Sequence, residues 1–258
     1  MVNPTIESLL SRTSIRRYAD GPVEKEILEL LLRAGVRAPS AGNLQNYSLM
    51  VVDDRNTLER LAEDAGAPFL AGAPMCIIGL VDHYRFKRLC EINDAPFAFD
   101  TADAVFIGMW DAIVALHTVS IAAESLGLGT CYIGFILETD NKELLGLPDH
   151  VFAAGMMAVG YPEAKPDLRT RLPLEAVVHK NTYSVPTDDE LRARYEDWMA
   201  KWDSFYERLS DEKKKHWNED LGVNNNAQYI TRTVYTPERM REWGRLVLKN
   251  IRGAGYDI

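Results

Sequence analysis

The stretch Arg12-Thr13-Ser14-Ile15-Arg16-Arg17-Tyr18 places three arginines within six positions near the start of an acidic chain. Arginine stays charged, its planar fork of donors fits phosphate oxygens, and the neighbouring hydroxyls add further donors. Like charges this close repel each other unless an anion lies between them. A second basic cluster, Arg169-Thr170-Arg171, follows far downstream. We expect the fold to bring both clusters to one phosphorylated ligand; a solvated basic turn without a ligand is the alternative.

Composition limits the fold and the partners. With 258 residues, 47% of them hydrophobic, the chain can bury the core of one large domain or two small ones. A formal charge of -9 argues against nucleic acid as a general partner, because phosphate backbones require a basic face. The widely spaced Cys76, Cys90 and Cys131 predict neither a disulfide framework nor a CxxC metal site. A reducing, cytoplasmic setting fits best.

Two apolar runs are candidates for membrane-spanning segments. Residues 66–81 are too few to span a bilayer as a helix. Residues 104–123 are long enough but include Asp111 and His117, so we expect a buried helix of a soluble protein. The start of the sequence carries Glu7 and lacks the basic lead and long apolar stretch of a signal peptide. No membrane partner is therefore expected.

Hydrophobic periodicity and capping residues predict helices alternating with short strands as far as residue 161. Helices are expected at 4–12, 23–37, 57–65, 83–91 and 100–126, with a capping box of Asp140 and Glu143 opening another that ends at 145. Strands are expected at 47–52, 75–81, 129–134 and 151–161. This order predicts an α+β or mixed α/β fold with a central mixed sheet flanked by helices.

The long helix at 100–126 is apolar on most sides, which indicates burial on most sides, in the core of a large domain or at the interface of a dimer. After Tyr183 the composition shifts, and we divide the chain into a domain at 1–183 and an extension at 184–258. A capping box of Thr187 and Glu190 predicts a helix to about residue 209, followed by a loop at 210–235 and a last helix from Thr236. The extension is interpreted as a helical arm that packs on the body or a partner subunit, with a lid over the site as the alternative.

Several familiar site motifs are missing from the sequence. The segment 126–129 follows a helix and lacks the third glycine of a dinucleotide fingerprint. No P-loop, GxSxG or HExxH motif occurs, and the five histidines lack ligand spacing, so no metal site is predicted. His117 is interpreted as a satisfied core residue, and Cys131 as a small buried residue with a reactive thiol as the alternative.

Four motifs nevertheless occur in a familiar order. They are Arg12-Thr13-Ser14-Ile15-Arg16, then Pro39-Ser40 with Asn43 and Gln45, then residues 126–130 with Ile133-Gly134, then Gly160-Tyr161-Pro162 with Arg169, Arg171, Leu172 and Pro173. This succession resembles the nitroreductase family of FMN-dependent NAD(P)H oxidoreductases over about residues 5–182. Each motif alone is weak, whereas four in order at plausible spacing form a specific pattern.

The resemblance implies positions around flavin mononucleotide (FMN). Arg12, Thr13 and Ser14 would approach its phosphate and ribityl chain, with the phosphate clamp completed by Arg169 and Arg171. Arg16 would reach the N1/O2 edge of the ring, where a fixed cation stabilises the reduced anion. The residues expected to come from the neighbouring subunit are Pro39, Ser40, Asn43 and Gln45. Those expected along the ring are Tyr132, Ile133 and Gly134, with a backbone N–H near Gly134 pointing at N5.

The family also implies an activity and an assembly. Its members are homodimers with two FMN at the interface, and they use NADH or NADPH to reduce nitroaromatics, quinones or flavins by ping-pong hydride transfer. No catalytic side chain is expected, because the chemistry belongs to the cofactor. Reductive dehalogenation, flavin fragmentation and flavin binding without turnover remain alternatives. One departure is that Ala41, Asn46 and Tyr47 replace the second Ser, the Pro and the Trp common in the family's loop.

Overall fold

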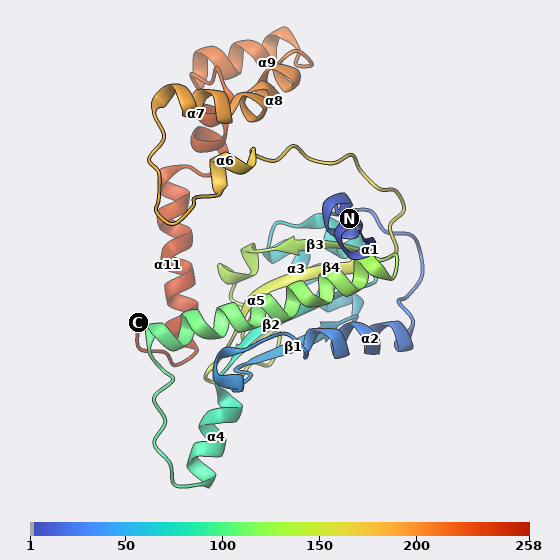
Figure 1. The fold of residues 1–258 in the computed structure, drawn as a ribbon, viewed down its shortest axis with the longest axis vertical. Helices are drawn as coiled ribbons and strands as arrows, with labels where there is room; N and C mark the ends of the chain where they lie inside the picture. Colours follow the sequence, from blue (N-terminus) through green and yellow to red (C-terminus); the bar gives the residue numbers. More distant parts are fainter. Residues whose placement is uncertain (1–2) are drawn as a thin grey trace. The chain divides into compact units, whose positions relative to one another are not determined.

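The computed structural model describes residues 3–258, and its central feature is a four-stranded sheet (Figure 1). The strand order is β1-β2-β4-β3, with bounds β1 Tyr47–Val52, β2 Met75–Asp82, β3 Gly129–Ile133 and β4 Val151–Gly160. All three ladders are antiparallel, so the prediction of a mixed sheet was wrong. The helical crossover makes β2 and β3 run in the same direction, but β4 lies between them and opposes both.

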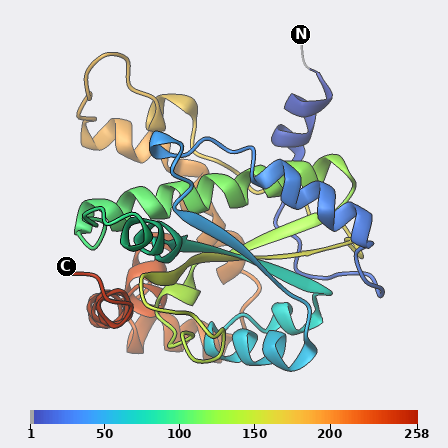
Figure 2. The same cartoon turned by 90° about the horizontal axis from the view of Figure 1, so that it is seen from below.

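Helices cover both faces of the sheet (Figure 2). Leu31 of α2 (Lys25–Gly35) and Leu116 of α5 (Ala102–Ser125) pack on one face, and Leu58 of α3 (Arg55–Asp64) packs on the other. Alternate residues of β2 divide between these two cores, because successive strand side chains point to opposite faces. This explains why every residue of β2 is buried. The α+β fold class predicted from the sequence is confirmed.

Helix α5 is the long apolar helix expected from the sequence. Thr101 caps it by accepting a hydrogen bond from the Ala104 amide. Only its sheet-facing side is buried; the opposite side carries an exposed stripe formed by Phe106, Trp110, Ile113 and Val114. The prediction of burial on most sides was therefore wrong for the single chain. Among the described helices, α5 alone has the length and apolarity to cross a membrane, yet half of its most apolar window is buried within the fold.

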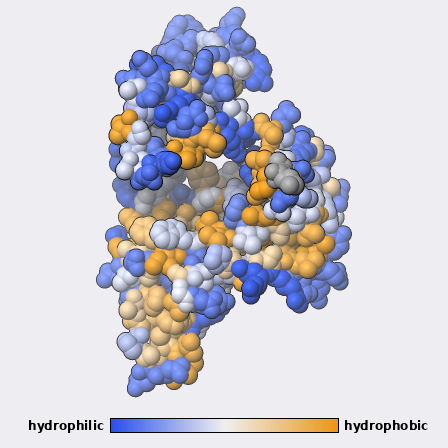
Figure 3. Space-filling view, viewed as in Figure 1, coloured by the Kyte–Doolittle hydropathy of each residue, from blue (hydrophilic) through white to orange (hydrophobic). Residues whose placement is uncertain are grey.

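The remaining helices and turns before residue 168 are short. They are α1 Pro4–Ser11, α4 Tyr84–Ile92 and the 3-10 turns η1 Ala41–Asn43, η2 Pro68–Gly72 and η3 Phe135–Leu137. Hydrophobic side chains gather at the surface over α4 (Figure 3), where Leu89 and Ile92 are exposed. The helix predicted at 140–145 is absent from the described residues. The Asn141 side chain instead bonds nearby carbonyls and holds this segment in turns.

The structure divides into two compact units. The first holds the described residues up to Leu168 together with Gly244–Ile258, and the second is Arg169–Trp243. The helix α11 (Pro237–Gly253) belongs partly to each. The division at residue 183 stays a prediction from the sequence.

The second unit contains more helix than the sequence predicted. Its α-helices are α6 Leu174–Val177, α7 Asp188–Arg194, α8 Glu196–Tyr206, α9 Asp211–Lys215 and α10 Asn226–Tyr229, with π-helical turns at η4 His216–Asp220 and η5 Ile230–Val234. The capping box of Thr187 and Glu190 is confirmed. The loop predicted at 210–235 is wrong, because Ser210 and Asn225 each cap a short helix there. Trp202 is buried among aromatic rings, so these rings provide packing.

Candidate functional site

The arginine stretch lies along the free edge of β3. Ser14 forms a parallel bridge with Thr130, and the Ile15 amide donates to the Thr130 carbonyl at 2.9 Å. The Tyr18 hydroxyl donates to the Ile15 carbonyl at 2.8 Å. The segment is therefore tied to β3 at Ser14 and Ile15 and to Pro162 at Tyr18, which differs from a loose basic turn.

The contact between this segment and β3 depends on a glycine. A Cβ atom at Gly129 would lie 2.3 Å from Cγ1 of Ile15, closer than carbon atoms can approach. Ile15 is itself buried. A residue without a side chain at position 129 is what lets the arginine segment lie this close to the strand.

Two buried donors in this segment lack protein partners. Arg12 Nη1 and Thr13 Oγ1 are both buried, and neither finds a hydrogen-bond partner within residues 3–258. Leaving such groups unpaired costs about 1–3 kcal/mol each, and more for a charged group. Arg12 also faces Glu124 of α5, whose carboxyl pKa is raised by burial and lowered in part by the Arg12 and Lys165 charges. Both donors fit a ligand that presents phosphate or hydroxyl oxygens.

The adjacent arginines Arg16 and Arg17 have different surroundings. The Arg16 guanidinium lies 5.5 Å from the centroid of the Phe69 ring. Both residues are exposed, and the Arg17 carbonyl accepts from the Glu163 amide at 3.1 Å. Arg16 is thus supported by an aromatic ring in a way that a freely solvated arginine is not.

The residues predicted to lie along the ring occupy the end of β3. Ile133 is buried, whereas Tyr132 and the following Gly134 are exposed. The Tyr132 hydroxyl lies 3.3 Å from Nδ1 of His117. Burial of its hydroxyl end raises the pKa of Tyr132 to about 12, although Ser120 and Arg12 nearby lower it in part.

Of two α5 residues near β3, one was misinterpreted from the sequence and the other was not identified. His117 is exposed, so its interpretation as a core residue was wrong. It lies one helical turn after the exposed Ile113, and the apolar pattern of the helix does not reveal that this side faces outward. Ser120 is buried and its hydroxyl lies 2.9 Å from that of Thr130, which fixes β3 against the helix.

The loop with Pro39, Ser40, Asn43 and Gln45 has a fixed shape. The Ala41 amide donates to Asp111 Oδ1 at 3.0 Å, and the Gln45 amide donates to Ser40 Oγ at 3.3 Å. Left-handed φ angles occur at Gly42, Asn43 and Gln45, at 56°, 55° and 54°. From α4, Arg85 donates to the Gln45 carbonyl at 2.8 Å. The carboxylate inside the apolar helix is therefore explained: Asp111 anchors this loop.

One chain does not bring the loop and the arginine segment together. The loop is anchored at Asp111 near the middle of α5, whereas Arg12 faces Glu124 at its C-terminal end. At a rise of 1.5 Å per residue these anchors lie about 20 Å apart along the helix. A ligand contacted by both sets of residues would need them from two chains.

Arg169 and Arg171 belong to the second unit. Arg171 Nη1 donates to the Arg169 carbonyl at 3.3 Å, and Arg171 lines a pocket of that unit with Arg194, Lys201 and Trp198. The predicted convergence of these arginines with residues 12–18 stays a prediction.

Comparison with known proteins gives this site a context. A family model described as "Nitroreductase family" matches residues 9–161. The chain is 33% identical over 242 residues to "FMN reductase [NAD(P)H]" of Bacillus subtilis (strain 168), covering 91% of this chain and 94% of the relative. It is 34% identical over 223 residues to "Oxygen-insensitive NADPH nitroreductase" of Salmonella typhimurium, covering 85% and 90%.

Solved structures of similar fold carry related names. Nitroreductase A from Vibrio parahaemolyticus matches with a TM-score of 0.79 at 29% identity, covering 99% of each chain. The NADPH:FMN oxidoreductase from Vibrio harveyi complexed with NAD+ matches with a TM-score of 0.74 at 26% identity, covering 95% of this chain and 98% of the other. The fold, the edge-bound arginine segment and these similarities agree, and the chain belongs to the nitroreductase family.

Proposed function

We propose that this protein is an FMN-dependent oxidoreductase that takes electrons from NADH or NADPH and reduces small, electron-poor acceptors such as nitroaromatics, quinones or flavins. The relatives named as FMN reductase and NADPH nitroreductase support the reaction class. The observation that carries the proposal is the pair of buried donors, Arg12 Nη1 and Thr13 Oγ1, without protein partners at the edge of β3. They fit an anionic, hydroxyl-rich ligand, as FMN is.

The site residues have distinct proposed roles. FMN, when bound, would supply the two-electron hydride chemistry. Arg12, Thr13 and Ser14 hold its phosphate and ribityl oxygens, and Arg169 with Arg171 completes that clamp. Arg16 places a fixed positive charge at the pyrimidine edge of the ring. The backbone N–H near Gly134 donates toward N5, and Tyr132 and Ile133 lie along the ring.

We propose a homodimer in which the loop of one subunit, with Pro39, Ser40, Asn43 and Gln45, completes the site of the other. Two observations support it: the loop and the arginine segment are anchored about 20 Å apart along α5, at Asp111 and Glu124, and the α5 stripe formed by Phe106, Trp110, Ile113 and Val114 is exposed. An apolar stripe of this kind is typical of a subunit interface. Sedimentation of the FMN-loaded protein should give twice its 29.1 kDa. A particle of 29.1 kDa would contradict the dimer.

The setting proposed is the cytoplasm, with small molecules as the partners. The three buried cysteine thiols fit a reducing compartment. The charge of -9 disfavours nucleic acid, and the partly buried α5 disfavours a membrane span.

The direct test is to purify the protein, record its visible absorbance and add NADH or NADPH without oxygen. The proposal expects a bound flavin that the nucleotide bleaches and that a nitroaromatic or quinone acceptor restores. A colourless protein that ignores added FMN would overturn the proposal. A flavin that neither nucleotide bleaches would indicate a binding protein without turnover.

The neighbouring arginines offer a matched pair of variants. Arg16→Ala should weaken FMN binding about tenfold or more, equivalent to about 1.4 kcal/mol, because a charge-assisted contact to the ring edge is lost. Arg17→Ala should change binding by no more than about twofold, since Arg17 is given no contact with the flavin and a charge in solvent at a distance contributes little. Fluorescence titration of the apoprotein with FMN measures both. Equal effects of the two substitutions would contradict these assignments.

A further inference from the structure

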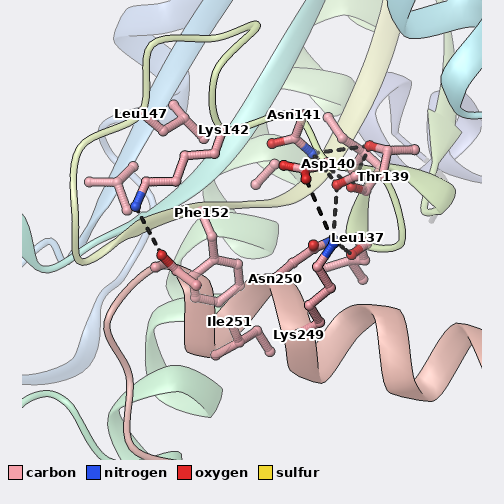
Figure 4. Close-up of a pocket in the computed structure, with 15 residues that line it drawn as sticks. Leu137, Thr139, Asp140, Asn141, Lys142, Leu147, Phe152, Lys249, Asn250 and Ile251 are labelled. Carbon is pink, nitrogen blue, oxygen red and sulfur yellow. Dashed lines mark hydrogen bonds and ion pairs between the residues drawn. The ribbon is translucent and has the colours of Figure 1, made fainter.

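The turn that follows Gly134 is held by two asparagine side chains (Figure 4). Asn250 of α11 donates from Nδ2 to the carbonyls of Leu137 and Thr139, both at 2.9 Å. Asn141 donates from Nδ2 to the carbonyl of Ile136 at 2.9 Å. Three carbonyls of a short turn therefore depend on side-chain amides, one of which comes from the far end of the chain.

Asn250 uses its full donor capacity in this contact. A side-chain amide has two N–H donors, and here they bond two different carbonyls. Aspartate at this position would keep the shape but place negative oxygens against the same carbonyls. Asn250 is therefore specified by hydrogen bonding and not by its volume.

The turn is continuous with the end of β3. The Leu137 amide donates to the Gly134 carbonyl at 3.1 Å, so Gly134 is the first residue of the turn that Asn250 holds. Ile136 is fully buried and the Thr139 carbonyl also accepts from the Asn141 amide at 3.1 Å, so within residues 3–258 the Leu137 carbonyl is the one that Asn250 alone bonds. A shift of Leu137 and Thr139 would therefore change the direction of the peptide at Gly134.

The rest of the C-terminal segment is fastened without Asn250. Lys142 Nζ donates to the Gly253 carbonyl at 2.9 Å, and the Tyr256 hydroxyl donates to the His150 carbonyl at 2.8 Å. The Asp257 amide donates to the Asp100 carbonyl at 2.7 Å. Loss of the Asn250 amide would thus free the Leu137 carbonyl, while Asn141 keeps its bonds to the turn and the end of the chain stays in place.

We propose that Asn250 is a positioning residue for flavin reduction: from α11 it fixes the turn 134–139 and so aims the backbone at Gly134 toward the flavin ring. The inference rests on the proposed function, in which that backbone N–H serves N5. Because the phosphate contacts come from residues 12–14, Asn250 should affect the reactivity of the bound flavin far more than its retention.

The experiment compares Asn250→Asp with Lys249→Ala in the full-length, FMN-loaded protein. Lys249 precedes Asn250 and reaches the same segment through an exposed ion pair with Asp140 at 3.8 Å, so it is a matched control. Stopped-flow reduction by NADPH or NADH without oxygen, whichever reduces the wild type faster, gives the rate. Redox titration gives the potential, and fluorescence gives FMN affinity.

Asn250→Asp should slow flavin reduction at least tenfold and shift the flavin potential, while FMN affinity changes less than threefold. Lys249→Ala should match the wild type in all three measurements. If Asn250→Asp does not fold, Asn250→Ala, which removes both donors without adding a charge, should show the same pattern. An Asn250 variant with normal rate and potential, even one less heat-stable, would overturn this inference alone. A wild-type protein that binds no FMN would overturn the proposed function together with it.

Discussion

Replacing Gly129 with alanine should release the flavin and lower the free energy of unfolding by about 3 kcal/mol. The added methyl would meet Ile15 at 2.3 Å from Cγ1 and 2.7 Å from Cβ, and the second of these atoms sits directly on the backbone. Ile15 cannot turn aside, because its amide is bonded to the Thr130 carbonyl and its side chain is buried. The arginine segment must therefore leave the edge of β3, taking Arg12 and Thr13 with it.

Gly72→Ala is the matched control for this change. A Cβ atom at Gly72 meets nothing within 4 Å, and its φ angle is not in the left-handed region. This variant should keep wild-type stability and flavin content. Urea unfolding and the flavin retained after gel filtration measure both quantities. Normal flavin content in Gly129→Ala would show that the arginine segment does not need its close contact with the strand.

Acid should destabilise the protein through His83, by up to about 3 kcal/mol between neutral pH and pH near 4. His83 is fully buried, and burial lowers its pKa to about 4, with His150 adding to this effect and Asp82 opposing it. The folded protein therefore keeps His83 neutral where the unfolded chain, with its ordinary pKa of about 6.5, binds a proton. Stability from this group is complete above that value and is lost as pH falls toward 4.

The hydrogen bonds identify a replacement that removes the titration and keeps the donor to Tyr256. The single proton of the Tyr256 hydroxyl goes to the His150 carbonyl at 2.8 Å, so Nδ1 of His83, at 2.9 Å, must donate to that hydroxyl. The other ring nitrogen is buried and has no hydrogen-bond partner in residues 3–258. Asparagine reproduces the Nδ1 donor and does not titrate.

His83→Asn should therefore unfold with a shallower dependence on pH than the wild type. The measurement is urea unfolding of both proteins at a series of pH values from neutral to about 4, and the difference between them isolates His83 from the other groups. His150, whose pKa burial also lowers, remains in both proteins, so the pH dependence left in His83→Asn includes its contribution. Parallel pH profiles would mean that His83 does not titrate in this window.

Local patterns gave much of the fold. The strand β1 was predicted at its observed bounds. The helix cap at Thr187 and the apolar strand β2 could also be predicted, because each depends on residues close together in the sequence. The Asp140 capping box failed for a reason that local patterns do not contain. Asn141 bonds the carbonyls of Ile136 and Thr139, and Asn250, far along the chain, bonds the second of these as well.

The candidate site divides in the same way. Arg12 and Thr13 were recognisable because charged and hydroxyl donors crowd one short stretch. Asp111 and Arg85 were not, because each acts on the loop at 40–45 from a distant element and resembles an ordinary helix residue in sequence. The sequence of α5 is apolar both on the side that faces the sheet and on the side that faces outward. The exposed stripe could therefore be identified only from the structure.

The insertion of β4 between β2 and β3 has a consequence for how the protein matures during translation. The segment 12–18 is among the first parts made, but the strand it docks on pairs only with β4, which ends at Gly160. The nascent amino terminus must therefore wait while more than half of the polypeptide leaves the ribosome, and closing so long a loop is slow. We therefore expect the cofactor to bind late in biogenesis, after the sheet has formed, and not to assist the formation of the sheet.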